Sequence, residues 1–233
     1  LEILSSDQLS DTTKDILNKL HNRSSSAEDL KISLRVITNA LYTYYQQKVI
    51  VLIDEYDVPL QAAYQNNYYE EMVEFLRSVF SSALKTNDAL EKGVMTGCLR
   101  ISKESIFTGL NNFTAYSVLN NISSESFGFT ELEVKQLLKA YNLSEKMDEV
   151  KEWYDGYNFG EFEVYCPWDV MNYLRDLQND LNARPVSYWK NTSDNAIIRS
   201  FIDYTGAAIR KKLEVLIAGG SICQKIEEDL TYD

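Results

Sequence analysis

Histidine and cysteine are both scarce in this chain of 233 residues, and their scarcity limits the chemistry that the chain can perform. The single histidine is His21, and the three cysteines, which form no CxxC pair, are Cys98, Cys166 and Cys223. One histidine all but excludes Ser-His-Asp triads and multi-histidine metal sites. An odd, sparse set of cysteines predicts neither a disulfide framework nor a zinc knuckle, and it is typical of a cytoplasmic protein.

Long apolar runs are absent, and basic residues are outnumbered. No stretch has the length of a bilayer span and no signal-peptide pattern is present, so we expect no association with a membrane. Lys and Arg total 23 against 35 Asp and Glu, a formal net charge of −12. This charge repels phosphodiester backbones, so nucleic-acid binding is not supported, although one local basic patch would survive it. An anionic ligand would need a site that locally overrides the acidic field.

The first half of the sequence alternates between helical and strand patterns. Apolar residues recur at helical spacing over residues 28–47 and again over residues 67–86. An unbroken apolar run, Val49–Ile53, follows the first of these segments, and a second short run covers residues 93–99. The order helix, strand, helix, strand predicts an α/β fold with a parallel sheet, in which Val49–Ile53 would be buried on both faces.

The pattern after about residue 125 is helical throughout. Thr130 and Glu133 have the spacing of a capping box, and Pro167 is well placed to open a later helix. Further helices are expected near residues 194–204 and over residues 207–218, the last one ending at a pair of glycines. We therefore predict an α/β domain over residues 1–125 and an all-helical C-terminal subdomain over residues 126–233.

Two adjacent acids, Asp54 and Glu55, end the Val49–Ile53 run abruptly. Ligands of open parallel sheets collect at the carboxyl ends of the strands. In a phosphoryl-transfer site the first acid would hold Mg²⁺, and the second would polarise the attacking water. The alternative interpretation is a core strand followed by a helix whose N-terminus attracts acidic residues.

Three ordered stretches resemble a bacterial family of predicted AAA-ATPase-like proteins, which are P-loop NTPases often fused to a PD-(D/E)XK nuclease-like domain. These stretches are VIVLIDEYDVPLQ at 49–61, GVMTGCLRISKESIFTGLNNF at 93–113, and WYDGYNFG with VYCPWDVMNYL between 153 and 174. The resemblance implies a partial P-loop NTPase sheet with flanking helices, and ATP and Mg²⁺ as ligands. The proteins it would contact are a second copy of the chain or a fused nuclease-like domain.

The resemblance also assigns roles to individual residues. Asp54 matches the Walker B metal ligand, and Glu55 matches the catalytic base. Thr96 stands at the place of the sensor-1 residue, and Arg100 becomes a candidate contact to phosphate or to a neighbouring subunit. A structural ion pair between Arg100 and an acid such as Asp57 is an equally good interpretation. Asp57 itself would either support the bound cofactor or cap the turn before the following proline.

The phosphate-binding loop GxxxxGK[ST] is missing, because the sequence contains no Gly-Lys dipeptide. The resemblance places that loop upstream of Leu1, so the chain resembles a fragment of a longer protein. We expect the chain alone to bind ATP weakly and to be inactive, with open sheet edges that favour self-association or a distorted sheet. Besides an ATPase, the sequence is compatible with a non-hydrolysing nucleotide-dependent switch or interaction module, or with a scaffold that binds no nucleotide.

Other features have simpler explanations. A cluster of aromatic residues at 153–168 is explained by packing better than by base stacking. Glu133 with Lys135, and Glu149 with Lys151, match the ExK fragment of nucleases, but both pairs lie in helical periodicity rather than on a strand. Cys98 has no histidine to activate it and is expected to be buried in packing.

Overall fold

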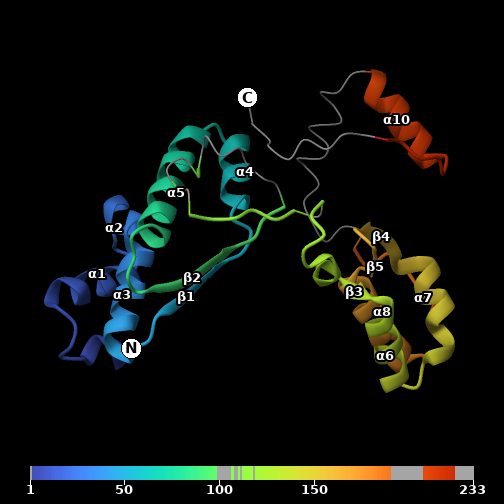
Figure 1. Ribbon diagram of the computed structural model, residues 1–233, viewed down its shortest axis with the longest axis horizontal. Coiled ribbons are helices and arrows are strands. Elements are labelled where there is room, and N and C mark those ends of the chain that lie inside the picture. The colour runs from blue at the N-terminus through green and yellow to red at the C-terminus, as the bar shows by residue number, and fades with distance from the viewer. Residues whose placement is uncertain are drawn as a thin grey trace. The chain divides into compact units, whose positions relative to one another are not determined.

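The chain folds into two compact units, each with its own hydrophobic core (Figure 1). The first unit is Leu1–Phe113 with Ser221–Asp233, and the second is Thr114–Gly220. The computed structural model describes residues 2–98, 106–107, 110, 112–117, 119–189 and 207–223.

Short helices with local caps make up much of the first unit. Their bounds, with the 3₁₀ helix η1, are η1 Glu2–Ser5, α1 Asp11–His21, α2 Ala27–Lys31, α3 Ser33–Tyr45, α4 Val58–Gln65 and α5 Tyr69–Leu84. Ser10 caps α1 by accepting from the Thr13 amide at 3.2 Å. Ser26 and Asp29 form a capping box at α2, and α3 ends at Gln46 in the left-handed conformation. The long helix predicted over 28–47 is therefore wrong, since α2 and α3 are separate and meet at Ile32.

Two parallel strands, β1 Val49–Ile53 and β2 Leu90–Met95, form the sheet of the first unit. Leu52 lies opposite Val94 and Ile53 opposite Met95 in the register. Helices α3 and α5 pack on one face of this sheet (Figure 1). The core of the unit forms there, where Val73, Leu76, Val79 and Phe80 of α5 are buried and Ile53 packs against them.

The opposite face of the sheet is open, which corrects the prediction that β1 is buried on both faces. Side chains alternate along a strand, so Val51 is 9% exposed while Ile50 and Leu52 are 59% and 73% exposed. A parallel sheet is normally covered on both sides. Among the described residues, β1 and β2 also each keep one unpaired edge. The self-association that such edges favour stays a prediction.

The second unit packs helices around a small antiparallel sheet of order β3-β5-β4. Its main elements are β3 Phe129–Thr130, α6 Glu131–Ala140, α7 Met147–Tyr154, β4 Asp155–Phe159, β5 Phe162–Tyr165, α8 Pro167–Asn179 and α10 Ala207–Ile217, with 3₁₀ helices η2 Ser124–Phe127 and η3 Ser144–Lys146. The predicted capping box at Thr130 is confirmed, and α8 begins at Pro167 as expected. Gly219 follows α10 with φ +79°, a conformation that glycine adopts without strain. The helix predicted at 194–204 lies outside the described residues.

The prediction of an all-helical C-terminal subdomain over residues 126–233 is therefore wrong, because β4 and β5 form a hairpin in this part of the chain. Gly160 makes the turn with φ +61°. Tyr157 and Phe159 on one strand and Val164 and Tyr165 on the other are residue types that favour strands. The sequence interpretation attributed these aromatic residues to helix packing, but the packing surface that they supply is a sheet.

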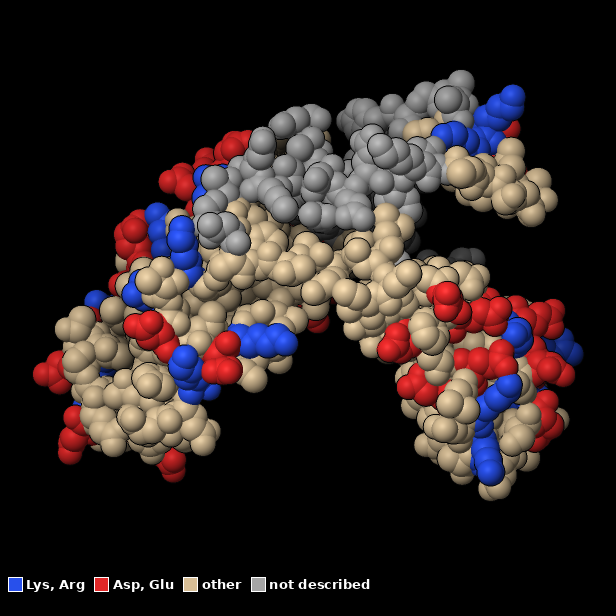
Figure 2. All heavy atoms as spheres, in the orientation of Figure 1, with Lys and Arg blue, Asp and Glu red and all other residues tan. Residues whose placement is uncertain are grey.

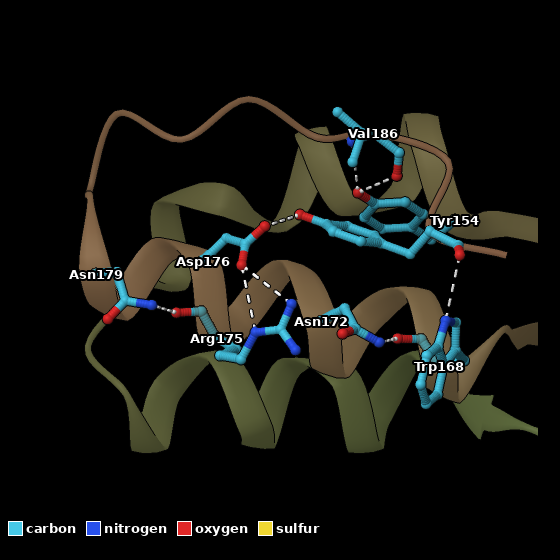
Figure 3. Close-up of polar contacts among 8 residues, drawn as sticks. Tyr154, Trp168, Asn172, Arg175, Asp176, Asn179 and Val186 are labelled. Carbon is cyan, nitrogen blue, oxygen red and sulfur yellow. Dashed lines mark hydrogen bonds and ion pairs between the residues drawn. The ribbon is translucent and has the colours of Figure 1, made fainter. Parts of the chain in front are cut away.

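Tyrosine hydroxyls tie the loop after α8 to the helices of the second unit (Figure 3). The Tyr154 hydroxyl donates to the Val186 carbonyl and accepts from the Val186 amide, both at 3.1 Å. Tyr188 donates to Asp176 at 2.6 Å, and the Trp168 indole donates to the Tyr188 carbonyl at 3.3 Å. Of the aromatic cluster at 153–168, Tyr154 and Tyr165 are buried in the core as the packing interpretation predicts, whereas Trp153, Tyr157 and Trp168 are 51%, 57% and 49% exposed. None of the helices in the described parts of the chain is both long and apolar enough to span a membrane.

Candidate functional site

The carboxyl ends of β1 and β2 meet, and the backbone holds them together one residue beyond the strands. The Thr96 amide donates to the Ile53 carbonyl at 2.9 Å, and the Tyr56 amide donates to the Thr96 carbonyl at 3.0 Å. Asp54 and Glu55 therefore leave β1 at the point where Thr96 leaves β2. The register of a parallel pair brings these residues into one place although 42 positions separate Asp54 from Thr96.

Asp54 is the centre of this site. Its Oδ1 accepts the Thr96 hydroxyl and also the Glu55 backbone amide, the latter at 3.0 Å. Its Oδ2 has no hydrogen bond from the residues that the structure describes. Both the Asp54 and the Thr96 side chains are exposed. One carboxylate oxygen is thus fixed by the protein, and the other remains accessible to a ligand.

Glu55 has an unusual backbone conformation, with φ +52°. Non-glycine residues rarely adopt the left-handed region, but six other described residues of this chain do so, among them Gln46 at the end of α3, so the conformation alone does not mark a functional site. The conformation turns the chain sharply after β1, so that the Glu55 side chain is exposed at the sheet end beside Asp54. Two acids with different environments follow each other: Asp54 is held by Thr96, and Glu55 extends into solvent.

Asp57 follows the two acids in the turn after β1 and is fully buried, at 0% exposure. Its Oδ1 accepts the Cys98 amide at 3.2 Å, and its Oδ2 accepts the Gln61 side-chain amide at 2.7 Å. Asp57 thereby connects the start of α4 to the loop that follows β2. It is the N-cap residue of α4, but its side chain makes no capping hydrogen bond. Of the two roles that the sequence predicts for Asp57, the structure does not show the helix cap. A contribution of Asp57 to cofactor binding stays a prediction.

Gly97 is a site residue that the sequence interpretation missed. A Cβ at this position would lie 2.6 Å from Asp57 Oδ1 and 2.7 Å from the Tyr56 ring, closer than real contacts allow. Only glycine lets the loop after β2 approach Asp57 this closely. The available signal was a glycine next to Thr96 inside the second predicted run at 93–99, although the strand itself ends earlier, at Met95.

The comparison with known protein families assigns this part of the chain. The family model described as Predicted AAA-ATPase matches residues 3–107, which lie within the first unit. This segment is therefore similar to the predicted AAA-ATPase family. A protein of Azotobacter chroococcum mcd 1, described as an uncharacterized protein in the vnfD 5' region, is 34% identical over 127 residues. The match covers 54% of this chain and 24% of that relative, so the chain spans about a quarter of its length. No solved structure matches the chain.

Cys98 adjoins the acids in this AAA-ATPase-like segment, and it is exposed rather than buried in packing as expected. Partial burial of its sulfur raises the pKa of the thiol, and the carboxylates of Asp57, Glu55 and Asp54 raise it further. The thiol therefore stays protonated at neutral pH, which argues against a role as a nucleophile.

The fit of Mg²⁺ to this AAA-ATPase-like site depends on oxygen donors. Asp54 Oδ2 and the neighbouring Glu55 carboxylate are exposed oxygens of the kind that Mg²⁺ accepts, and Mg²⁺ commonly uses only one or two protein carboxylates beside water and phosphate. The described residues contain no group of three or more His, Cys, Asp or Glu that would hold a metal by itself. Asp54 and Glu55 would therefore supply one or two of the ligands of Mg²⁺, and water or phosphate oxygens would have to supply the rest. Arg100 lies outside the described residues.

Proposed function

We propose that this chain supplies the metal and water side of a Mg²⁺-dependent ATPase site. Asp54 would be the metal ligand, Glu55 the general base and Thr96 the residue that orients the attacking water. The observation that supports this proposal best is the hydrogen bond from the Thr96 hydroxyl to Asp54, made where two parallel strands end side by side.

Each side chain has a separate task in this proposal. Asp54 Oδ1 accepts the Thr96 hydroxyl and the Glu55 amide, which orients the carboxylate before any ligand binds. Asp54 Oδ2 would then be the oxygen that binds the metal. Glu55 stands outside this hydrogen-bonded pair and is the acid that can accept a proton from water. When bound, Mg²⁺ would neutralise charge that develops on the phosphate oxygens. Asp57 would act through the backbone by holding the loop of Thr96 and Cys98 in place.

A phosphate-binding loop must come from outside this sequence, because the chain has no Gly-Lys dipeptide. We therefore expect the chain alone to bind Mg²⁺ and ATP weakly. Calorimetric titration of the chain with Mg²⁺ and ATP tests this expectation, and micromolar affinity would contradict it.

The decisive experiment measures ATP hydrolysis by the full-length protein and by its Glu55→Gln variant. Loss of a general base is expected to lower the rate by about 10²–10⁴-fold while ATP binding is retained. The matched control is Glu91→Gln, since Glu91 is an exposed acid at the opposite end of β2. This control should hydrolyse ATP at the wild-type rate.

The outcomes separate the candidate functions. Equal rates in wild type and Glu55→Gln would refute the role of Glu55 as the base. Tight ATP binding by the wild type without turnover would instead favour the nucleotide-dependent switch, in which the same residues sense a bound phosphate and do no chemistry. Absence of ATP binding by the full-length protein would favour a scaffold.

A further inference from the structure

The hairpin of β4 and β5 in the second unit has two unlike faces, because the side chains of a strand alternate between them (Figure 1). Tyr165 belongs to the core that α6, α7 and α8 form, so its face of the hairpin is the inner one. Phe162 of β5 lies on the other face, and Phe159 of β4 lies directly opposite Phe162 in the register. Tyr157, two residues before Phe159, shares this outer face.

The outer face carries a continuous group of aromatic rings. Phe127 of η2 packs edge-to-face on Phe159 with ring centroids 5.5 Å apart, and Tyr157 stacks on Phe159 at 5.9 Å. Tyr157, Phe127 and Phe162 are 57%, 46% and 42% exposed. We call these four residues the aromatic patch. Single exposed apolar residues are common, but a contiguous exposed patch is typical of an interaction site.

The strand β4 is also an edge of its sheet. It pairs with β5 on one side, and no residue in the described parts of the chain pairs with its other side. Gly156, Tyr157 and Asn158 are all exposed, and a Cβ added at Gly156 would meet nothing within 4 Å. The open edge therefore adjoins the aromatic patch. An extended segment can use both features, because it forms main-chain hydrogen bonds along an edge and places its side chains on the face.

The charge of this region selects the chemistry of such a segment. Residues 114–134 and 152–174, which include η2 and the hairpin, contain no Lys or Arg. The acids in and beside the hairpin are Glu152, Asp155, Glu161 and Glu163. In Figure 2, Asp and Glu atoms gather on the part of the second unit where Figure 1 shows β4 and β5. This acidic field attracts a basic segment and disfavours pairing with a second copy of the same acidic strand.

Asp155, the first residue of β4, adds a second observation. Its carboxylate is partly buried and has no hydrogen bond or ion pair from the residues that the structure describes. Burial raises the pKa of this carboxyl, and the neighbouring Glu163 raises it further, whereas Lys151 lowers it. Lys151 is itself bonded to Glu131 at 2.9 Å and to Glu163 at 3.2 Å. A cation from another molecule would stabilise the charged form of Asp155.

We propose that the open edge of β4 binds an extended segment of a partner protein in which aliphatic and basic residues alternate. An added strand would place every second side chain over the aromatic patch, where aliphatic groups pack well. The side chains between them would lie on the inner-face side, where Asp155 and Glu163 provide carboxylates for Lys or Arg. All residues of this surface belong to the second unit, so the proposal does not depend on the proposed ATPase site.

The test titrates the chain with a short fluorescent peptide in which valine and lysine alternate, and measures the anisotropy at low salt. Saturable binding at one site per chain is expected. A peptide in which valine and glutamate alternate should not bind, because its charge is reversed. The valine–lysine peptide with N-methylated backbone amides keeps its charge but cannot add a strand, and it should bind at least about tenfold more weakly.

A double variant of the chain tests the two faces of the docking edge. Tyr157→Ser with Asp155→Asn should bind the valine–lysine peptide about tenfold more weakly, since one aromatic contact and one charge contact are lost. The matched control is Tyr141→Ser with Asp148→Asn, which makes the same two changes at exposed positions elsewhere in the second unit. This control should bind the peptide as the wild type does.

Backbone amide shifts on the unmodified chain locate the site without relying on a variant that folds. The peptide should shift the amides of Gly156, Tyr157 and Asn158 and leave that of Gly97 in the first unit unchanged. No saturable binding, equal binding of the N-methylated peptide, or equal binding by the Tyr157/Asp155 variant would each overturn the proposal. Self-association of the chain that shifts the same amides would assign the edge to a second copy and would also overturn it. None of these results depends on ATP binding or hydrolysis.

Discussion

Replacing Gly97 with alanine tests the geometry that supports the candidate site. The new Cβ would lie 2.6 Å from Asp57 Oδ1 and within 2.9 Å of two atoms of the Tyr56 ring. Asp57 cannot move away freely, because it is fully buried and accepts hydrogen bonds from Cys98 and Gln61. One of these groups must shift, and the loop after β2 is expected to separate from Asp57.

The size of the effect follows from two terms. Overpacking a well-packed site and weakening one hydrogen bond to a buried carboxylate together cost about 2–4 kcal/mol. Alanine also restricts the unfolded chain, which returns about 0.4–1 kcal/mol. The net loss in the free energy of unfolding is therefore about 1–3.6 kcal/mol, and it should be confined to the first unit.

The chain offers both a separate readout for each unit and a matched control. All three tryptophans, Trp153, Trp168 and Trp189, belong to the second unit, so their fluorescence follows only its unfolding. Hydrogen exchange of residues 49–61 reports the stability of the first unit. The control is Gly156→Ala, because a Cβ at Gly156 would meet nothing within 4 Å.

We expect Gly97→Ala to accelerate exchange over residues 49–61 in urea and to leave the tryptophan transition unchanged. Gly156→Ala should alter neither by more than about 1 kcal/mol. Unchanged exchange in Gly97→Ala would refute the close approach of the loop to Asp57. An equal loss in the tryptophan transition would show that the effect is not local to the site.

Two further predictions concern the second unit. Leu138 is 0% exposed in the core, and Leu132 is 65% exposed on the same helix. Leu138→Ala should therefore lower the free energy of unfolding of the unit by about 2–5 kcal/mol, and Leu132→Ala by less than about 0.5 kcal/mol. Tryptophan fluorescence in urea measures both changes. Hydrogen bonds from Lys135 and Lys151 lower the pKa of the Glu131 carboxyl from 4.5 to about 2. Its contribution to stability is therefore present above about pH 4.5 and is lost as the pH falls towards 2, and Glu131→Gln should flatten this part of the pH profile. Because Glu131, Lys135 and Lys151 lie at the surface of the unit, added salt should also weaken the effect, and a salt-independent profile would contradict this assignment.

Residues close in sequence were sufficient to predict several features of the fold. The β-branched run of β1, the capping box at Thr130, the start of α8 at Pro167 and the glycine stop after α10 all depend on interactions within a few positions. The position of Asp54 and Glu55 after β1 is a local property of the same kind. The pairing of β1 with a parallel second strand followed from the order of the elements.

Tertiary structure alone decided what these residues contact. The burial of Asp57, the close approach of Gly97 and the exposure of Cys98 depend on the register that joins two segments 41 positions apart, which no local pattern encodes. The local sequence determines which face of a helix or strand a side chain occupies. Which other residues that face contacts depends on how elements that are far apart in the sequence pack together.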